Sequence, residues 1–328
     1  MILSIIIVNW NSREYLDSCL KSIKESGMDF PYEIIVVDNA SYDGSREMIR
    51  NRYEDVKYIQ CDVNGGFSYA NNVGFEHSLG EYLLFLNPDT EIRGDAISEM
   101  VRVLSSHQDA GAVGCTLLNP DGSCQTSCIQ SFPTIINQVL DSDLLRKILP
   151  KSSLWGNAPL FATSNGISQV EVISGACIMV KRETFVSVGR FCRDYFMYSE
   201  DVDICYKISK AGHKILFIKN ACIVHHGGVS TNNQKKIRFI TVVMNDSKLK
   251  YFVKYKGNFY ASLFRIAMAT NALVRLALLM VVSPVYYCRH RSIPSDSIYK
   301  WSYTLIWGIE PESLINTCIP SKTNTALF

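Results

Sequence analysis

The sequence predicts an α/β protein with a mostly parallel, Rossmann-like central sheet flanked by helices. Short apolar runs of strand length, such as Ile2–Val8 and Glu33–Val37, alternate with segments whose apolar residues recur at helical spacing. Strands that alternate with helices pair in parallel through crossover connections. The apolar runs end abruptly in Asn or Asp. This pattern predicts polar side chains at the carboxyl edge of the sheet, where open α/β sheets bind ligands.

Each expected element follows from its apolar pattern. The helices have apolar residues on one face, at Leu16, Cys19, Leu20 and Ile23, at Met48, Ile49 and Tyr53, and at Ile97, Met100, Val101 and Leu104. Ser41 or Asp43 can cap the second of these helices. Further helices are expected over residues 67–79 and 201–211, with Gly212 closing the latter. The remaining strands are expected at residues 58–61, 82–86, 111–118, 178–180, 214–218 and 222–224. Residues 119–170 are expected to form a long acceptor-side loop or an inserted hairpin.

Composition limits the class of protein. The chain has 328 residues and 47% hydrophobic content, which fits one large domain or one domain with an appendage. A net charge of +2 gives no indication of a nucleic-acid partner. The eleven cysteines form no C-x-x-C or Cys/His zinc spacing, which favours a reducing, cytoplasmic protein. Residues 2–8 lack the basic flank of a signal peptide and are expected to be the first strand.

The C-terminal part has a different character. Between residues 234 and 256 there is a single acid, Asp246, among several basic residues. These are Lys235, Lys236, Arg238, Lys248, Lys250, Lys254 and Lys256. The apolar stretch 261–288 that follows is interrupted by Arg265, Arg275 and Pro284, and its longest uncharged piece is shorter than a membrane-spanning helix. We expect residues 1–231 to be one α/β domain and residues 232–328 a basic and apolar helical region.

The buried strand 82–86 ends at Asn87-Pro88-Asp89-Thr90. Pro88 cannot donate to a strand ladder, so pairing should stop there. Asp89 then lies on the ligand-binding edge of the sheet, where a carboxylate suits a divalent cation bound to phosphate. These four residue types are equally typical of an ordinary turn, and the segment alone leaves both interpretations open.

Two more segments follow strands. Asp38 can accept hydrogen bonds from a base or ribose, or it can cap the next helix. Residues 64–75 open a helix with Gly65 and Gly66, which allow close approach of phosphate to a helix N-terminus. The segment matches neither G-x-G-x-x-G nor the P-loop, which opposes a nicotinamide-dependent dehydrogenase.

Two further segments contain acids or histidines that could act in catalysis or bind a metal. The first turn of an expected helix contains three acids, Glu200, Asp201 and Asp203. One interpretation is that the helix dipole simply stabilises them there. The alternative is that one of them is a general base whose pKa is raised by burial and by the neighbouring carboxylates. His225 and His226 follow a strand and are either metal ligands or exposed turn residues. The chain has no G-x-S-x-G motif or Ser/His/Asp order, so nucleophilic hydrolysis is not expected.

Together these segments resemble the family 2 inverting glycosyltransferases of GT-A fold, and most closely their bacterial rhamnosyltransferase-like branch. The matching segments occur in family order over residues 1 to about 231. They are SIIIVNWN (4–11), IIVVDNASYDGS (34–45), NGGFSYANNVGF (64–75), LNPDT (86–90), SGACIMVKR (174–182), VGRF (188–191), FMYSEDVDICYK (196–207) and HHGGVST (225–231).

The resemblance implies a role for each site residue. Asp201 matches the catalytic base, and Asp89 and His225 match the metal ligands, with His226 a less favoured substitute. Glu200 is expected on the acceptor side, together with Gly175, Ala176 and Cys177. The residues expected to bind the nucleotide-sugar are Asn9, Asn11, Asp38, Asn64, Gly65, Gly66, Phe67 and Asn87, the last replacing the first aspartate of the family's D-x-D element.

The function implied is a metal-dependent glycosyltransferase that uses Mg²⁺ or Mn²⁺ and a nucleotide-sugar, with dTDP-L-rhamnose the expected donor. The expected acceptor is a lipid-linked saccharide in surface polysaccharide or O-antigen synthesis, and no nucleic acid is expected. Rivals are another donor, such as galactofuranose or another hexose, and an inactive saccharide-binding or scaffold protein. The C-terminal region is expected to associate with the cytoplasmic face of the cell membrane, as a peripheral protein. Its alternative role is packing on the protein or in a homo-oligomer.

Overall fold

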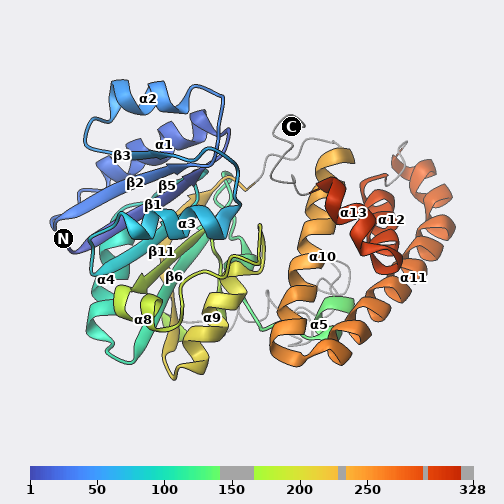
Figure 1. Ribbon diagram of the computed structural model, residues 1–328. Helices are drawn as coiled ribbons and strands as arrows, with labels where there is room; N and C mark the ends of the chain where they lie inside the picture. The colour runs from blue at the N-terminus through green and yellow to red at the C-terminus, as the bar shows by residue number, and fades with distance from the viewer. Residues whose placement is uncertain (141–165, 228–233, 291–294, 319–328) are drawn as a thin grey trace. The chain divides into compact units, whose positions relative to one another are not determined.

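The computed structural model describes residues 1–140, 166–227, 234–290 and 295–318, which form two compact units (Figure 1). As far as they are described, the sheet unit comprises Met1–Phe132, Ser142–Arg193 and Glu200–Gly228. The helical unit comprises Pro133–Asp141, Asp194–Ser199 and Val229–Phe328. The domain boundary expected between residues 231 and 232 lies outside the described residues, so that boundary stays a prediction.

The sheet unit is α/β, as predicted. Its described strands are β1 (Leu3–Asn9), β2 (Tyr32–Asp38), β3 (Lys57–Gln60), β4 (Tyr82–Leu86), β5 (Thr90–Ile92), β6 (Ala110–Leu118), β8 (Ile167–Gln169), β10 (Cys177–Lys181) and β11 (Lys214–His225). They form one sheet in the order β3-β2-β1-β4-β10-β6-β11-β5, with β8 paired to β11. A separate small sheet pairs β7 (Ile129–Gln130) with β9 (Val172–Ile173).

The large sheet is mixed in direction. Strands β3, β2, β1 and β4 run parallel to one another, and β6 runs parallel to β11. Strand β10 is antiparallel to both of its neighbours, β4 and β6. The described parts of the connection from β6 to β10, residues 119–140 and 166–176, contain the short strands β7, β8 and β9, so a single helical crossover does not impose a parallel direction on β10.

Five of the six α-helices described in the sheet unit lie where the sequence predicted them, and the sixth, Arg182–Ser187, was not predicted. They are α1 (Arg13–Glu25), α2 (Ser45–Arg52), α3 (Phe67–Glu76), α4 (Ala96–Ser106), α8 (Arg182–Ser187) and α9 (Glu200–Lys210). Helix α3 ends three residues earlier than expected, at Glu76. The two strands expected at 214–218 and 222–224 are one strand, β11, whose pairing with β6 is shifted by a bulge between Ile218 and Cys222.

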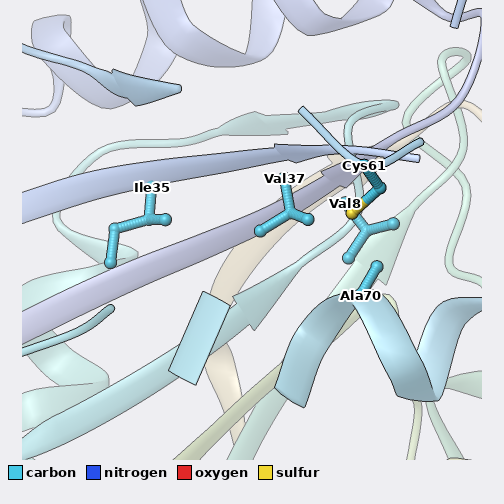
Figure 2. Packing of buried hydrophobic residues seen from close by; sticks show 5 residues of the cluster. All are labelled: Val8, Ile35, Val37, Cys61 and Ala70. Carbon is cyan, nitrogen blue, oxygen red and sulfur yellow. The ribbon is translucent and has the colours of Figure 1, made fainter. Parts of the chain in front are cut away.

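Helix α3 packs tightly on the first two strands. Ala70 of the helix belongs to one buried cluster with Val8 of β1, Ile35 and Val37 of β2, and Cys61 (Figure 2). One helical turn further, a Cβ on Gly74 would lie 2.4 Å from the Ile6 side chain, so only glycine fits there. This close packing fixes the start of α3 beside the carboxyl ends of β1 and β2.

The helical unit is built from α5 (Ile135–Val139), α10 (Gln234–Lys256), α11 (Asn258–His290), α12 (Ser295–Ile309) and α13 (Pro311–Cys318). Gly257, with a φ of 85°, separates α10 from α11. The buried aromatic core of the helical unit is formed by Phe252, Phe264 and Trp307.

Helix α11 is the one described helix long and apolar enough to cross a membrane, over Asn258–Ser283, with a mean hydropathy of 1.9. It continues through Pro284, where the sequence predicted an interruption. A proline removes one hydrogen bond from a helix, which neighbouring turns can tolerate.

Candidate active site

One edge of the large sheet collects the residues that the sequence singled out. The carboxyl ends of the parallel strands β1, β2 and β4 meet there, and they carry Asn9, Asp38 and the segment 87–89. Strand β11 has the same direction as these strands and ends at His225. Because β10 is antiparallel, it brings its first residues, not its last, to this edge. The antiparallel strand therefore places residues 174–177 beside the strand ends.

The first cluster at this edge is built around the buried carboxylate of Asp38. Its Oδ2 accepts a hydrogen bond from Asn9 Nδ2 at 2.8 Å. Its Oδ1 accepts from the Ser41 N–H at 2.7 Å and from Gln60 Nε2 at 2.9 Å. The Tyr58 side chain also interacts with this carboxylate, which is fully buried, so its acceptor positions are used within the protein. The side chain thus holds the loop after β2 in place, close to the helix-capping role considered from the sequence.

The loops after β1 and β2 are tied to each other through Asn11. The Asn11 N–H donates to Ser41 Oγ at 2.9 Å, and the Tyr42 N–H donates to Asn11 Oδ1 at 3.0 Å. Ser41 therefore serves this connection and does not cap α2, for which it was considered. Gly44 occupies the cap position of α2, and Asp43 Oδ1 accepts from the Ser45 N–H at 3.1 Å.

The glycine segment before α3 is held by Asn39, a residue that the sequence marked only as polar. Its Nδ2 donates to Asn64 Oδ1 at 2.7 Å, and its Oδ1 accepts from the Gly65 N–H at 3.0 Å. A Cβ on Gly65 would lie 2.4 Å from the Tyr69 ring, and Gly66 has a φ of 86°. Both positions therefore require glycine. Phe67, which follows, packs edge-on against Phe191, with ring centroids 6.3 Å apart.

Asp89 and His225 lie together, although 135 residues separate them in the chain. Strand β5 pairs with the end of β11, with Thr90 opposite His225. This pairing brings Asp89 Oδ1 to 3.4 Å from His225 Nε2, and both side chains are partly exposed. His226 turns elsewhere: its Nε2 lies 2.8 Å from Glu91 Oε1, and its ring contacts Tyr15. Of the two histidines, the structure brings His225 to Asp89, as expected.

Gln125 fixes the orientation of the His225 ring, a role that sequence reasoning missed. Its Nε2 donates to the backbone carbonyl of His225 at 2.7 Å and to Asn119 Oδ1 at 2.9 Å. A backbone carbonyl only accepts hydrogen bonds, so the Gln125 atom bonded to it must be the amide nitrogen. The other amide atom is therefore the oxygen Oε1, which lies 2.9 Å from His225 Nδ1. Nδ1 must then carry the proton in the neutral ring. The lone pair on Nε2 points toward Asp89, as a metal-ligating histidine requires.

This arrangement gives a direct prediction. Gln125→Leu removes the acceptor that holds the Nδ1 proton, so affinity for Mn²⁺ in the presence of nucleoside diphosphate should fall about 10- to 100-fold. Titration calorimetry of the purified protein would measure this. The matched control is Gln108→Leu, a glutamine in the loop after α4, outside the site. Equal metal affinity in Gln125→Leu and the wild type would exclude the orienting role.

Asp201, in the first turn of α9, is held by two backbone donors. The Gly175 N–H donates to its Oδ2 at 3.1 Å, and the Val202 N–H donates to its Oδ1 at 2.8 Å. A Cβ on Gly175 would lie 3.3 Å from Asp201 Cβ, which explains a residue without a side chain at this position. The next residue, Ala176, accepts a hydrogen bond from the Asn87 N–H at 2.9 Å. The 174–176 turn therefore joins the segment of Asp89 to Asp201.

The other residues expected on the acceptor side differ in position. The Cys177 side chain is in the core, 2% exposed, and contacts Met100 and Cys115. Its side chain therefore offers no surface to an acceptor, because β10 is buried on both faces, and the place of Gly175 and Ala176 on the acceptor side stays a prediction. The Glu200 carboxyl is also buried, and it lies directly beside Asp201 in the chain.

The two adjacent carboxyl groups have shifted pKa values. Burial, followed by the charge of Asp201, raises the pKa of Glu200 to about 8. Burial also raises the pKa of Asp201, and the N–H donors of Gly175 and Val202 partly oppose that rise. Glu200 is therefore mostly protonated at neutral pH. Glu200 then adds little negative charge beside the carboxyl that the two N–H groups hold.

The raised pKa of Glu200 predicts a pH-dependent stability. A folded-state pKa above the unfolded value means that the folded protein retains a proton that the unfolded chain releases. Stability therefore falls as pH rises from about 4.5 to about 8. Glu200→Gln removes this cost, so its stability should match the wild type near pH 4. Near pH 8.5 it should exceed the wild type by roughly 1 kcal/mol or more. Urea unfolding at the two pH values would measure the difference, and an equal offset at both would contradict it.

Comparison with known proteins agrees with this arrangement. Residues 4–142 match the model of Glycosyl transferase family 2. An N-acetylglucosaminyl-diphospho-decaprenol L-rhamnosyltransferase of Mycobacterium tuberculosis is 27% identical over 248 residues, covering 70% of this chain and 78% of that protein. Rhamnosyltransferase WbbL of Escherichia coli K12 is 26% identical over 231 residues, covering 68% of this chain and 82% of that protein.

A solved structure has the same fold. The mannosyltransferase PcManGT from Pyrobaculum calidifontis, in complex with GDP-Man and Mn²⁺, aligns with a TM-score of 0.59 over 94% of this chain and 87% of that one, at 15% identity. This likeness confirms the predicted GT-A fold class. The match of residues 4–142 to Glycosyl transferase family 2 and the two rhamnosyltransferase relatives support a family 2 glycosyltransferase of the rhamnosyltransferase-like branch.

Proposed function

We propose that this glycosyltransferase moves L-rhamnose from dTDP-L-rhamnose onto a lipid-linked saccharide, with inversion at the anomeric carbon, during synthesis of a surface polysaccharide such as O-antigen. The observation that carries the proposal is the placement of Asp89, His225 and Asp201 at one sheet edge. The donor is proposed because two relatives are rhamnosyltransferases, and the lipid-linked acceptor because one of these is named for a diphospho-decaprenol substrate.

The residues present fit a divalent cation, Mg²⁺ or Mn²⁺. Asp89 offers a carboxylate oxygen, and His225 offers the nitrogen lone pair that Gln125 leaves free. Among the described residues no group of three potential metal ligands occurs, so phosphate oxygens of the donor would complete the coordination. When bound, the cation would neutralise the diphosphate leaving group.

Asp201 is proposed as the general base for the acceptor hydroxyl. Its carboxylate accepts the proton as the acceptor oxygen attacks the anomeric carbon on the face opposite the diphosphate, so the configuration inverts. A single displacement needs one base and no covalent intermediate, by analogy with inverting glycoside chemistry. The N–H groups of Gly175 and Val202 hold the carboxylate in place before reaction. Glu200, mostly protonated at neutral pH, adds little charge beside it.

The nucleotide is proposed to bind over the loops after β1 and β2 and at the start of α3. Asn9, Asn11 and Asp38 build those loops through their hydrogen bonds, and so would hold the surface on which the base or ribose lies. Asn64 to Phe67 would line the nucleotide-sugar, with the α3 N-terminus favouring phosphate. Asn87 would lie beside the sugar, between Asp89 and the 174–176 turn.

Two other functions are less well supported than rhamnose transfer. Another donor, galactofuranose or a different hexose, would use the same base and metal ligands with a different sugar pocket. An inactive saccharide-binding or scaffold protein is opposed by the presence of Asp38, Asp89, Asp201 and His225 together.

A donor screen tests the proposal. The purified protein is incubated with Mg²⁺ or Mn²⁺ and a panel of dTDP-, UDP- and GDP-sugars, and release of nucleoside diphosphate by hydrolysis is measured, so the acceptor is not needed. The expected result is fastest release from dTDP-L-rhamnose. Faster turnover of another donor would overturn the rhamnose assignment, and release from no donor, with nucleotide-sugar binding intact, would favour the inactive alternative.

A further inference from the structure

Helix α11 of the helical unit has two faces of opposite character. Ala261, Phe264, Met268 and Ala272 are each at most 6% exposed, and they lie on one side of the helix. The opposite side carries large apolar residues between 42% and 79% exposed, namely Phe259, Leu263, Ile266, Val274, Leu278 and Val281. At 3.6 residues per turn these six fall within about 120° of arc. They form a continuous stripe, called here the outer stripe.

The two arginines that interrupt this apolar helix both turn away from the outer stripe. Arg265 donates from Nε to the Gly308 carbonyl at 2.8 Å and from Nη2 to the Ile309 carbonyl at 2.7 Å, at the C-terminal end of α12. A cation there complements the helix dipole and satisfies carbonyls that have no helical partner. Arg265 thus stabilises the helical unit and leaves no charge on the outer stripe.

Arg275 is held in the same way at the end of α5. Its Nη2 donates to the Val139 carbonyl at 3.2 Å, and its guanidinium lies 4.5 Å from the centre of the Trp301 ring. Asn271 donates to the same carbonyl at 3.1 Å and accepts from Arg275 Nε. The two charges that interrupt the apolar stretch in the sequence are therefore satisfied inside the unit.

The composition of the outer stripe favours lipid over protein as its partner. Helix α11 contains no Asp or Glu over Asn258–His290. The outer stripe is mainly aliphatic, with one aromatic ring, whereas protein interfaces are enriched in Tyr, Trp and Arg. Lys254 and Lys256 are exposed just before the helix begins, where they suit anionic headgroups.

Crossing the membrane is disfavoured by what α11 packs against. A spanning helix would take its neighbours through the hydrocarbon with it. Helix α12, packed on α11 through Gly308 and Ala269, carries exposed Asp296 and Lys300. The charged residues of α10 would face the same cost. A helix that is apolar on its outer side and packed on its inner side matches an interfacial helix.

We propose that the outer stripe of α11 docks on an anionic lipid bilayer, with the helix lying in the plane of the interface and inserted from one side. The described span Asn258–Ser283 has 26 residues and would extend about 39 Å along the surface. This goes beyond the proposed transfer reaction, which uses residues of the sheet unit. For a lipid-linked acceptor, it would keep the enzyme at the surface where the acceptor lies.

The test is flotation of the purified full chain with vesicles of phosphatidylcholine and phosphatidylglycerol. The wild type should float with the vesicles and be released by an alkaline carbonate wash, as an interfacial helix would be. The double variant Ile266→Glu/Val274→Glu should bind at least tenfold more weakly, since two exposed apolar side chains are lost from the contact. The matched control is Val186→Glu on α8 of the sheet unit, which replaces an apolar side chain that is also exposed, at 50%, and should bind like the wild type.

Three results would overturn the proposal. They are a wild type that does not float, a double variant that floats as well as the wild type, and retention through the carbonate wash, which would indicate a spanning helix. A wild type that is a dimer in solution and does not float, with a monomeric double variant, would assign the stripe to a second copy of the chain. Donor hydrolysis in solution is measured on the same samples. Absence of flotation with intact hydrolysis would contradict the membrane docking proposal and leave the proposed transferase function standing.

Discussion

Asp201→Asn should lower sugar transfer by about 10²- to 10⁴-fold, the usual contribution of a general base, while nucleotide-sugar binding stays nearly intact. The amide has almost the same shape, but it cannot accept the acceptor proton. It also presents an NH₂ group to one of the two backbone N–H donors, Gly175 or Val202. The expected cost to the free energy of unfolding is about 1 kcal/mol. Transfer rates and calorimetric binding of the donor would measure the two effects separately.

A pH profile strengthens this test. Because burial raises the pKa of Asp201, wild-type transfer should fall as pH decreases through that value, since the base becomes protonated. The residual activity of Asp201→Asn should lack this limb. The control is Asp95→Asn, an exposed acid before α4, which should retain wild-type rate and profile. Preserved turnover in Asp201→Asn would remove Asp201 as the base.

Asp89→Ala should abolish most of the metal-dependent part of nucleotide binding. The wild type is expected to bind dTDP at least tenfold more tightly with Mn²⁺ than with EDTA, and the variant should bind it about equally in both conditions. Alanine removes the carboxylate 3.4 Å from His225 Nε2 and leaves the β5–β11 pairing, which uses backbone atoms. Titration calorimetry with dTDP would measure the four affinities.

The control for this variant is Glu91→Ala, which removes an acid two residues along the same segment. Glu91 holds His226, not His225, so its loss should leave the metal dependence unchanged. If the wild type itself bound dTDP equally with and without metal, the assignment of Asp89 and His225 to a cation would fail. They would then form an ordinary ion pair.

Much of this arrangement could be predicted because it depends on local pattern. The polar residues at strand ends, Asn9, Asp38 and Asp89, follow apolar runs, and parallel strands bring such ends to one edge. The acids of α9 occur at a helix start. By contrast, the direction of β10 depends on how a 119–176 connection returns to the sheet, and no residue type along it encodes that direction.

The orienting role of Gln125 could not be predicted for a related reason. It follows from the contact between a loop residue and a strand end 100 positions away. Nothing in the segment around Gln125 distinguishes it from an ordinary surface glutamine. The inward turn of Arg265 and Arg275 was hidden because a linear hydropathy pattern counts charges and does not record which helix face they occupy.

The 174–176 turn constrains the length of the chain at this place. Gly175 and Ala176 serve Asp201 and Asn87, while the next residue, Cys177, begins β10 with its side chain in the core. Inserting or deleting one residue here would move β10 by one position and exchange the side chains packed on its two faces, which are both buried. Homologous chains should therefore keep the length of this turn constant. A one-residue insertion should prevent folding of the sheet, and with it reaction at both halves of the site.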